Sequence, residues 1–355
     1  MVQVRAESRN VGRSGVLVPT TYADARIEPL ADGFGRVHTD LRVSVTDRCN
    51  LRCTYCMPEE GLSWLTRAEV LSDDEIVRLI GIGVDRLGIR TVRLTGGEPL
   101  LRHGLPGLVS RIVDIDPALK VSLTTNGIGL KRMAPALADA GLHRVNVSLD
   151  TLRRDRYQEI TRRNRIDDVF AGLRAAQDAG LSPVKINAVP VRGVNDDEIV
   201  DLAEFAVEYG YRMRFIESMP LDAQAAWERD KMITADEIVE RLSKRFTLEP
   251  VEREDNAPAE EWRVVGTDHL IGVIASVTRA FCGTCDRVRL TADGQLRTCL
   301  FATRESDLRS LLRGGSGDAD IEAAWRGAVA RKGAGHAINS PDFQQPDRPM
   351  SAIGG

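Results

Sequence analysis

Two groups of cysteines account for all six cysteines of this chain and define the chemistry open to it. The first group is Cys49, Cys53 and Cys56, which places three thiolates within eight residues at C-x3-C-x2-C spacing. A structural zinc site takes four ligands in a closed tetrahedron, whereas three thiolates can hold a [4Fe-4S] cluster and leave one iron open to another ligand. The spacing therefore favours an iron-sulfur cluster over zinc and over three buried, inert cysteines.

The second group is Cys282 and Cys285, followed by Cys299 after thirteen intervening residues. It again offers three thiolates, and His269 is the nearest candidate for a fourth ligand. A structural Cys3His zinc site is therefore the alternative to a second cluster here. In a reducing cytosol, two cysteine triads favour metal binding over disulfide bonds.

A short strand is expected between the cysteines of the second group. Residues 286–290 alternate in the manner of a β-strand, which would place Arg287 and Arg289 on one face beside the cysteines. The two guanidinium groups could hold an anionic ligand, or they could balance the negative charge of a cluster.

Length and charge narrow the class of protein. The chain has 355 residues, enough for one large domain or two, and its formal net charge is −4. This balance argues against a nucleic-acid-binding surface, although local basic pockets for a small phosphate ligand remain possible. Residues 1–15 lack an apolar segment, and the longest apolar run, Leu270–Val277, is too short to span a bilayer. We therefore expect a cytoplasmic protein without membrane or nucleic-acid partners.

The cysteines must be positioned by an alternation of strands and helices that begins at Leu41 and repeats six times. Such an alternation predicts an α/β fold with a parallel sheet, here an incomplete TIM-like (β/α)6 barrel. The expected strands are Leu41–Val45, Thr91–Leu94, Lys120–Thr124, Arg144–Leu149, Val184–Val189 and Arg212–Ile216.

Capping boxes mark three of the intervening helices. The sequences Ser72–Glu75, Asn195–Glu198 and Thr234–Glu237 each begin with a residue that can cap a helix and have Glu three positions later. The first should open a helix with Ile76, Leu79, Ile80, Val84 and Leu87 on one face.

Polar residues follow the predicted strands at the point where each strand ends. Because a parallel barrel carries its chemistry at the carboxyl ends of its strands, these residues should meet at one rim. They are the first cysteine group, Thr95–Pro99, Thr124–Gly127, Ser148–Asp150, Lys185–Asn187 and Glu217–Pro220.

Three regions are expected along the chain. Residues 1–40 lack periodicity and predict a mobile extension that orders, if at all, near Phe34 and Val37. Residues 41–246 form the barrel, and residues 247–355 form a C-terminal α+β domain that carries the second cysteine group. The six arginines of residues 153–165 are expected on a solvated segment rather than around a phosphate.

The cysteine loop with Tyr55, together with Gly96-Gly97-Glu98-Pro99, resembles the signatures of radical S-adenosylmethionine (SAM) enzymes. With the second triad, the Arg287-Val288-Arg289 run and the terminal Gly354-Gly355, residues 41–355 resemble the GTP 3′,8-cyclase family, which acts first in molybdenum cofactor biosynthesis.

The resemblance implies two [4Fe-4S] clusters, one held by Cys49, Cys53 and Cys56 and the other by Cys282, Cys285 and Cys299. The open iron of the first would chelate SAM, which would contact Tyr55, Gly97, Ser148 and Met219. The open iron of the second would take the guanine of GTP. Further GTP contacts would come from Arg42, Arg93, Thr124, Lys185, Arg287, Val288 and Arg289. Arg214 and the threaded glycines Gly354 and Gly355 would act in catalysis.

The implied reaction is radical cyclisation of GTP to (8S)-3′,8-cyclo-7,8-dihydroguanosine 5′-triphosphate. Implied partners are an external electron donor, a second copy in a homodimer, and cyclic pyranopterin monophosphate synthase, which receives the product. The alternatives are another radical SAM enzyme with an auxiliary cluster, for instance a peptide-modifying one, and a zinc-dependent or GTP-binding structural module without redox chemistry.

Overall fold

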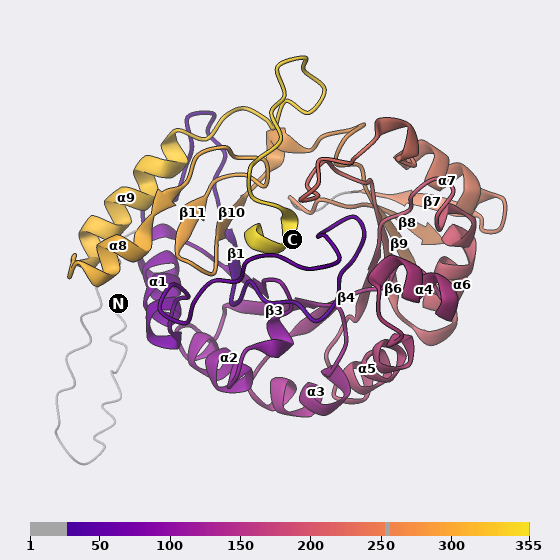
Figure 1. Cartoon of the computed structure of the whole chain (residues 1–355), viewed down its shortest axis with the longest axis horizontal. Coiled ribbons are helices and arrows are strands. Elements are labelled where there is room, and N and C mark those ends of the chain that lie inside the picture. Colours follow the sequence, from indigo (N-terminus) through magenta and orange to yellow (C-terminus); the bar gives the residue numbers. More distant parts are fainter. Residues whose placement is uncertain (1–26, 253–255, 355) are drawn as a thin grey trace, which may run out of the picture.

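The computed structural model describes residues 27–252 and 256–354, in which twelve strands form one sheet that curls into an open barrel with helices outside it (Figure 1). The strand order is β12-β11-β10-β1-β2-β3-β4-β5-β6-β9-β8-β7. The C-terminal end of the chain returns to the middle of the barrel (Figure 1).

The six predicted parallel strands are confirmed, with ends within two residues of those expected. Neighbouring strands of this set all pair in parallel. The strands are β1 (Asp40–Ser44), β2 (Thr91–Thr95), β3 (Lys120–Thr125), β4 (Arg144–Ser148), β5 (Lys185–Ala188) and β6 (Arg212–Ile216).

The C-terminal region extends this sheet instead of forming a separate layer. Strand β9 (Leu270–Ile274) pairs in parallel with β6, and β10 (Arg287–Leu290) pairs in parallel with β1, so eight strands run in parallel. Antiparallel strands complete both sides: β7 (Leu248–Val251), β8 (Glu260–Val264), β11 (Gln295–Arg297) and β12 (Ser306–Asp307). The predicted boundary after residue 246 is therefore crossed by the sheet.

Helices cover the outside of the barrel (Figure 1). In the part of the chain that the structure describes, no helix has the length and apolar character that crossing a membrane would need. The α-helices are α1 (Asp73–Leu87), α2 (Leu105–Val113), α3 (Leu130–Asp139), α4 (Arg154–Thr161), α5 (Ile166–Asp178), α6 (Ile199–Tyr209), α7 (Ala235–Ser243), α8 (Leu308–Arg313), α9 (Asp318–Ala330) and α10 (Met350–Ile353). Short 3-10 turns are η1 (Pro99–Leu101), η2 (Asp196–Glu198), η3 (Arg229–Lys231) and η4 (Cys282–Thr284).

Two of the three predicted capping boxes form. Ser72 and Thr234 each accept a hydrogen bond from the backbone of the Glu three residues on, and that Glu accepts one in return. All five residues of the predicted apolar face of α1 are buried. The third box is wrong, because Asn195 precedes the 3-10 turn η2 and its side chain bonds the backbone of Asp150, Val189 and Val191 instead.

The segment before β1 is more ordered than the sequence suggests. Residues 1–26 lie outside the described residues, but Leu30 is fully buried and its N–H donates to the carbonyl of Leu87 in α1. Phe34 and Val37, where order was expected, are exposed, whereas Asp32, Arg36 and His38 are buried. Polar contacts, which hydrophobic periodicity does not reveal, hold this segment in place.

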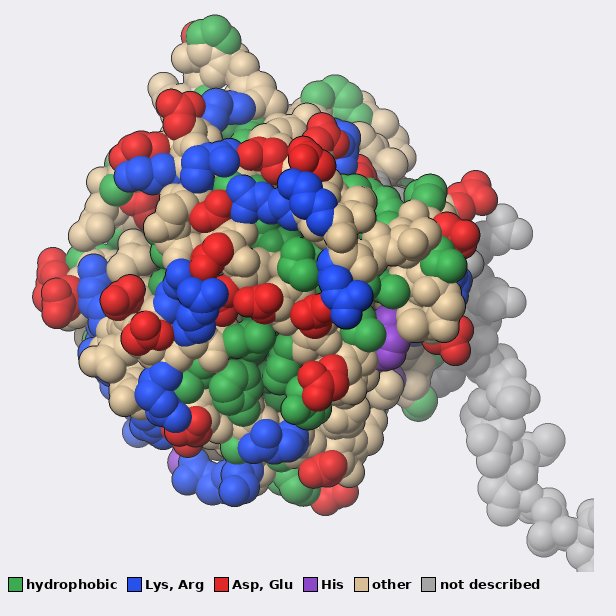
Figure 2. Space-filling view, turned by 90° about the vertical axis from the view of Figure 1, so that its right-hand side faces the viewer, with side chains coloured by type: hydrophobic (Ala, Val, Ile, Leu, Met, Phe, Trp, Pro, Cys, Tyr) green, Lys and Arg blue, Asp and Glu red, His purple; other side chains and the backbone are tan. Residues whose placement is uncertain are grey.

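The arginine-rich segment forms helix α4 and pairs with acids. Arg154 binds Asp167, and Arg156 binds Asp197 and Glu198. Basic and acidic side chains are interspersed on this side of the barrel, without a large basic patch (Figure 2). The helix in this segment is thus solvated and ion-paired, as predicted.

Candidate active site

Two cavities meet inside the barrel. The first, of about 200 Å3, is lined by Cys49, Cys53 and Cys56, and the second, of about 210 Å3, by Cys282, Cys285 and Cys299. Five residues line both cavities and so form their common wall: Thr124, Asn187, Val189, Ile216 and Met350. The fold therefore brings together two cysteine groups that lie more than 220 residues apart in the sequence.

Helix α4 fixes the first cysteine loop. The N–H of Arg52 donates to the carbonyl of Thr161, and the Arg162 guanidinium donates to the carbonyls of Arg52 and Met57 at 2.9 and 3.3 Å. Arg162 sits in the left-handed region at φ 57°, which is uncommon for a residue with a side chain. Sequence analysis missed Arg162, since nothing in its spacing separates it from the neighbouring surface arginines.

Gly96 and Gly97 pack the end of β2 against the same loop. A Cβ at Gly96 would overlap the carbonyl oxygen of Thr46, and one at Gly97 would overlap those of Asp47 and Arg48. The Gly97 N–H donates to the Thr46 carbonyl at 2.8 Å. Side chains are thus excluded at both positions by the protein backbone itself, whatever ligand binds here.

Glu98, the next residue, is fully buried and ties its own segment to the end of β3. Its carboxylate accepts hydrogen bonds from the Thr125 hydroxyl at 2.6 Å, the Asn126 N–H at 2.7 Å and the Leu100 N–H at 2.9 Å. Burial outweighs these hydrogen bonds and raises the pKa of Glu98 to about 7. Asn126 in turn reaches Asn50 in the cysteine loop at 2.7 Å.

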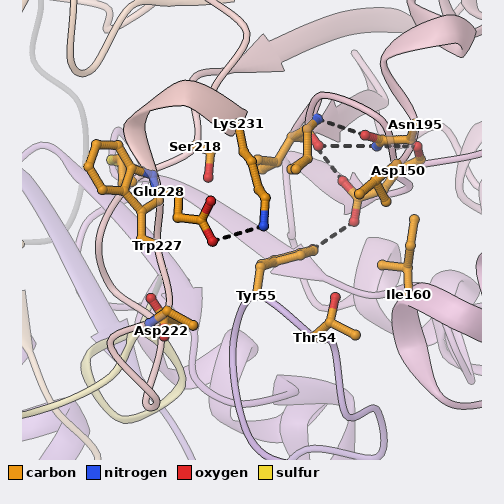
Figure 3. Close-up of a pocket in the computed structure, with 15 residues that line it drawn as sticks. Thr54, Tyr55, Asp150, Ile160, Asn195, Ser218, Asp222, Trp227, Glu228 and Lys231 are labelled. Carbon is orange, nitrogen blue, oxygen red and sulfur yellow. Dashed lines mark hydrogen bonds and ion pairs between the residues drawn. The ribbon is translucent and has the colours of Figure 1, made fainter.

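A side pocket of about 170 Å3 opens beside Tyr55 (Figure 3). The Tyr55 hydroxyl donates to Asp150 at 2.7 Å, and Asp150 also accepts from the Val189 N–H. Met219 and Trp227 lie in its wall, whereas Gly97 and Ser148 line the first cysteine cavity. Of the four residues implied as SAM contacts, Tyr55, Gly97 and Ser148 line the first cysteine cavity, whereas Met219 lines the side pocket and the second cysteine cavity.

The structure does not support the Cys3His zinc site. His269 lies just before β9 and lines a different cavity from the one that Cys282, Cys285 and Cys299 line. His336 is the histidine that lines the cysteine cavity, and its Nε2 lies 3.1 Å from the Ser276 carbonyl. Sequence analysis missed His336 because it lies far from the cysteines in the chain.

Glu217, at the end of β6, positions the segment that leads to the second triad. Its buried carboxylate accepts hydrogen bonds from the N–H groups of Ala235, Val277 and Thr278 at 2.7–2.9 Å, and from the Thr278 hydroxyl. It thereby joins β6, the start of α7 and the chain before Cys282.

Replacing Glu217 by Gln should destabilise the protein by about 1–3 kcal/mol, because an amide NH2 in either orientation meets at least one backbone N–H and leaves it unpaired. Urea-induced unfolding of the apoprotein measures this loss. The exposed Glu249→Gln substitution is the matched control and should leave the unfolding midpoint unchanged. Equal midpoints for the two variants would show that Glu217 does not hold this segment.

Cationic side chains crowd the second cavity. Burial and neighbouring arginines lower the pKa of Arg289 and of Arg214 to about 10. Residues implied by the resemblance that line this cavity are Arg42, Arg93, Thr124, Arg214, Arg287 and Arg289. Mutually repelling buried cations favour an anionic ligand, since nearby negative charge stabilises them.

Arginine nitrogens without hydrogen-bond partners also indicate that this cavity binds a ligand. In residues 27–252 and 256–354, the buried atoms Arg42 Nε, Arg93 Nε, Arg214 Nε and Arg287 Nη2 have no hydrogen-bond partner. Buried polar atoms are rarely left unpaired, so a polar ligand is expected against them.

Lys185 and Val288 lie elsewhere. Lys185 lines a wider cavity of about 850 Å3 at the amino ends of the strands, which shares Arg93, Arg214 and Arg287 with the second cavity. Val288 is fully buried in the hydrophobic core, so its side chain does not reach the cavity. The alternation of β10 explains this, because Arg287 and Arg289 face the cavity and Val288 faces away.

The C-terminal tail reaches the site from inside the barrel. Helix α10 supplies Met350 to both cavities and Ser351 to the first, and the Arg289 guanidinium donates to the Gly354 carbonyl. A Cβ at Gly354 would overlap Ser44 Oγ and lie 2.8 Å from Thr95 Cγ2. Gly355 lies outside the described residues.

The cysteines fit clusters better than single ions. Within the described ranges, no three His, Cys, Asp or Glu side chains are grouped so that they could hold one metal ion. A [4Fe-4S] cluster binds each thiolate to a different iron and so suits thiolates spaced around a cavity. Burial, and then the neighbouring cysteines, raise the pKa of Cys53 and that of Cys56, the latter to about 12, so a cationic core is needed to hold them as thiolates.

Comparisons with known proteins match this arrangement. The family model described as Radical SAM superfamily matches residues 43–206, and that described as Molybdenum Cofactor Synthesis C matches residues 211–338. A GTP 3′,8-cyclase of Streptomyces coelicolor is 61% identical over 328 residues, which cover 92% of this chain and 96% of the relative. A GTP 3′,8-cyclase 2 of Mycobacterium tuberculosis is 56% identical over 344 residues, covering 96% and 94%.

Solved structures share the fold at low sequence identity. Streptococcus suis SuiB bound to the precursor peptide SuiA has a TM-score of 0.57 and 16% identity, with 83% of this chain and 67% of that chain covered. SuiB bound to S-adenosylmethionine has a TM-score of 0.56 and 14% identity, with 89% and 75% covered.

Proposed function

Because this chain belongs to the GTP 3′,8-cyclase family, we infer that it cyclises GTP to (8S)-3′,8-cyclo-7,8-dihydroguanosine 5′-triphosphate, the first step of molybdenum cofactor biosynthesis. The observation that carries this inference is the pair of cysteine-lined cavities with a common wall, the second of them rich in arginine. Neither a peptide-modifying enzyme nor a zinc-binding module without redox chemistry is named among the relatives that match at 56–61% identity.

We propose that the first triad holds a [4Fe-4S] cluster with SAM and that the second triad holds another beside the guanine of GTP. When bound, the first cluster and SAM supply the 5′-deoxyadenosyl radical that removes hydrogen from C3′ of GTP. The residues of the chain bind, orient and enclose GTP. Arg42, Arg93 and Arg287 are proposed to pair with triphosphate oxygens, which suits the unsatisfied donors of these side chains.

The tail is proposed to close the reaction space. Gly354 lies between Arg289 and the end of β1, where a residue with a side chain does not fit. By filling this gap, the tail is proposed to reduce access of solvent to a carbon-centred radical.

Anaerobic incubation of the reconstituted protein with a reductant, SAM and GTP tests the proposed function. Formation of 5′-deoxyadenosine together with the cyclised nucleotide is expected. Cleavage of SAM without consumption of GTP would retain only the radical SAM chemistry and overturn GTP as the substrate.

GTP binding at pH 8 should take up about one proton per GTP through Lys185. Burial and the neighbouring Arg214 lower the pKa of Lys185 to about 7, so at pH 8 the side chain is mostly neutral in the empty cavity. A triphosphate favours its charged form and raises this pKa again, so binding draws in a proton. Calorimetric titration in buffers of different ionisation enthalpy measures the uptake.

Lys185→Met should abolish this uptake, and Lys244→Met, on the surface, should leave it unchanged. The same uptake in wild type and Lys185→Met would place the triphosphate away from Lys185.

We propose four further properties on the basis of the family. The enzyme takes its electron from an external donor, forms a homodimer and passes its product to cyclic pyranopterin monophosphate synthase. We propose a cytoplasmic location, which suits six cysteines that remain free of disulfides.

A further inference from the structure

A buried lysine contacts the second cysteine triad. Lys332 follows helix α9 and is only 5% exposed, and its Nζ lies 3.6 Å from Cys285 Sγ and 2.9 Å from the Arg287 carbonyl. A third contact, at 3.4 Å, reaches Nδ1 of His38. All three hydrogens of the ammonium thus have an acceptor within the described residues.

The segment before the barrel holds this lysine in place. His38 is fully buried, and its Nε2 lies 3.0 Å from Asp32 Oδ2. Burial, and then the Lys332 charge, lower the pKa of His38 to about 4, so its ring is neutral at pH 7. With Nε2–H donating to Asp32, Nδ1 is free to accept from Lys332, and the geometry fixes the ammonium toward the sulfur.

Arg36 also helps this segment to hold Lys332 in place. Its guanidinium pairs with Asp32 at 2.6 Å and donates to the carbonyls of Cys282, Gly333 and Ala334 at 2.6–2.7 Å. The backbone of one cysteine and the chain that follows Lys332 are therefore tied to the same side chain.

Cys285 is the cysteine that Lys332 contacts. Within the described residues, no carboxylate is among the hydrogen-bond acceptors of Lys332. A buried ammonium is costly unless it is paired, so the arrangement suits a site that carries negative charge when occupied.

We propose that Lys332 is a positioning residue of the second site, where its N–H···S hydrogen bond to Cys285 and its charge raise the reduction potential of the bound cluster. Hydrogen bonds to the sulfurs and nearby charge are among the features that set such potentials, because both stabilise the more negative, reduced state. This proposal rests on the proposed function, which places a cluster on Cys282, Cys285 and Cys299. It assigns the segment before β1 a role at the active site that the cysteine motifs do not indicate.

EPR-monitored redox titration of the reconstituted holoenzyme tests the proposal. Lys332→Met, which removes charge and donor, should shift the potential of the second cluster to more negative values, and Lys332→Gln, which keeps a donor, should shift it less. The first cluster of the same molecule should not shift. Arg331→Met removes an exposed cation one residue away and is the matched control, expected to leave both potentials unchanged.

The possible failures are distinguishable. The second cluster is identified beforehand as the EPR signal that Cys282→Ala removes, and absence of that signal from wild type would overturn the second-cluster assignment and this proposal with it. A signal that is present in wild type and keeps its potential in both Lys332 variants would overturn the role of Lys332 alone. If Lys332→Met fails to fold, the potential of the second cluster in Lys332→Gln, which is expected to shift by a smaller amount, tests the role of Lys332.

Discussion

Replacing Gly354 by Ala is expected to lower the rate of GTP cyclisation by about 100-fold or more, while cleavage of SAM remains measurable. A methyl group at this position would overlap Ser44 Oγ and approach Thr95 Cγ2, and φ is 84°, where L side chains are strained. The tail must then leave its place beside Arg289, and misplacement by about 1 Å can cost about 100-fold in rate. Parallel measurement of 5′-deoxyadenosine and cyclised nucleotide separates the two activities.

Gly315→Ala is the matched control for this variant. Gly315 also has positive φ, at 81°, but a Cβ there meets no atom within 4 Å. It carries the same backbone strain without the clash, so its cyclisation rate should match wild type. Wild-type cyclisation by Gly354→Ala would show that the tail does not need to reach this position during the reaction.

Cys53→Ala and Cys282→Ala are expected to remove different halves of the chemistry. Loss of one thiolate of three should empty its site, so the iron content should fall from about eight to about four atoms per chain in either variant. Cys53→Ala should abolish formation of 5′-deoxyadenosine. Cys282→Ala should retain it and lose the cyclised nucleotide, because the proposed guanine site is gone.

Each variant serves as the control for the other, and iron and sulfide analysis with product chromatography provides the readout. A wild-type iron content near four would contradict two clusters. Loss of 5′-deoxyadenosine in both variants would show that the two sites do not function separately.

Much of the fold could be predicted because its signals are local. The parallel strands β1 to β6 alternate with amphipathic helices, and short-range patterns such as the Ser72 capping box carry enough information to place helix starts. Asn195 shows the limit of this reasoning. Its sequence fits a capping box, yet its side chain donates hydrogen bonds to the backbone carbonyls of Asp150 and Val189 instead. Strands β9 and β10 show a second limit, since pairing with β6 and β1 depends on long-range register.

The candidate site also contains residues that could be predicted from the sequence and residues that could not. The cysteine triads were evident from spacing alone, whereas Arg162, His336 and Lys332 act through contacts with residues distant in sequence. A single arginine or lysine among 48 basic residues gives no signal of such a contact. Gly97 was expected to contact SAM, and the structure adds a reason for glycine there, because a Cβ would overlap the carbonyls of Asp47 and Arg48.

The placement of β9 and β10 has a consequence for biosynthesis of the chain. Strand β1 pairs with β10 through Asp40 and Arg287, and β6 pairs with β9 through Met213 and Ile271. The outer edges of β1 and β6 in the sheet of six strands therefore stay unpaired until residues 270–290 have left the ribosome. Exposed strand edges invite pairing with other chains, and contacts of such high sequence separation form slowly. The nascent protein therefore passes through an interval in which its open edges favour aggregation, and its yield should depend on chaperone capacity as well as on final stability.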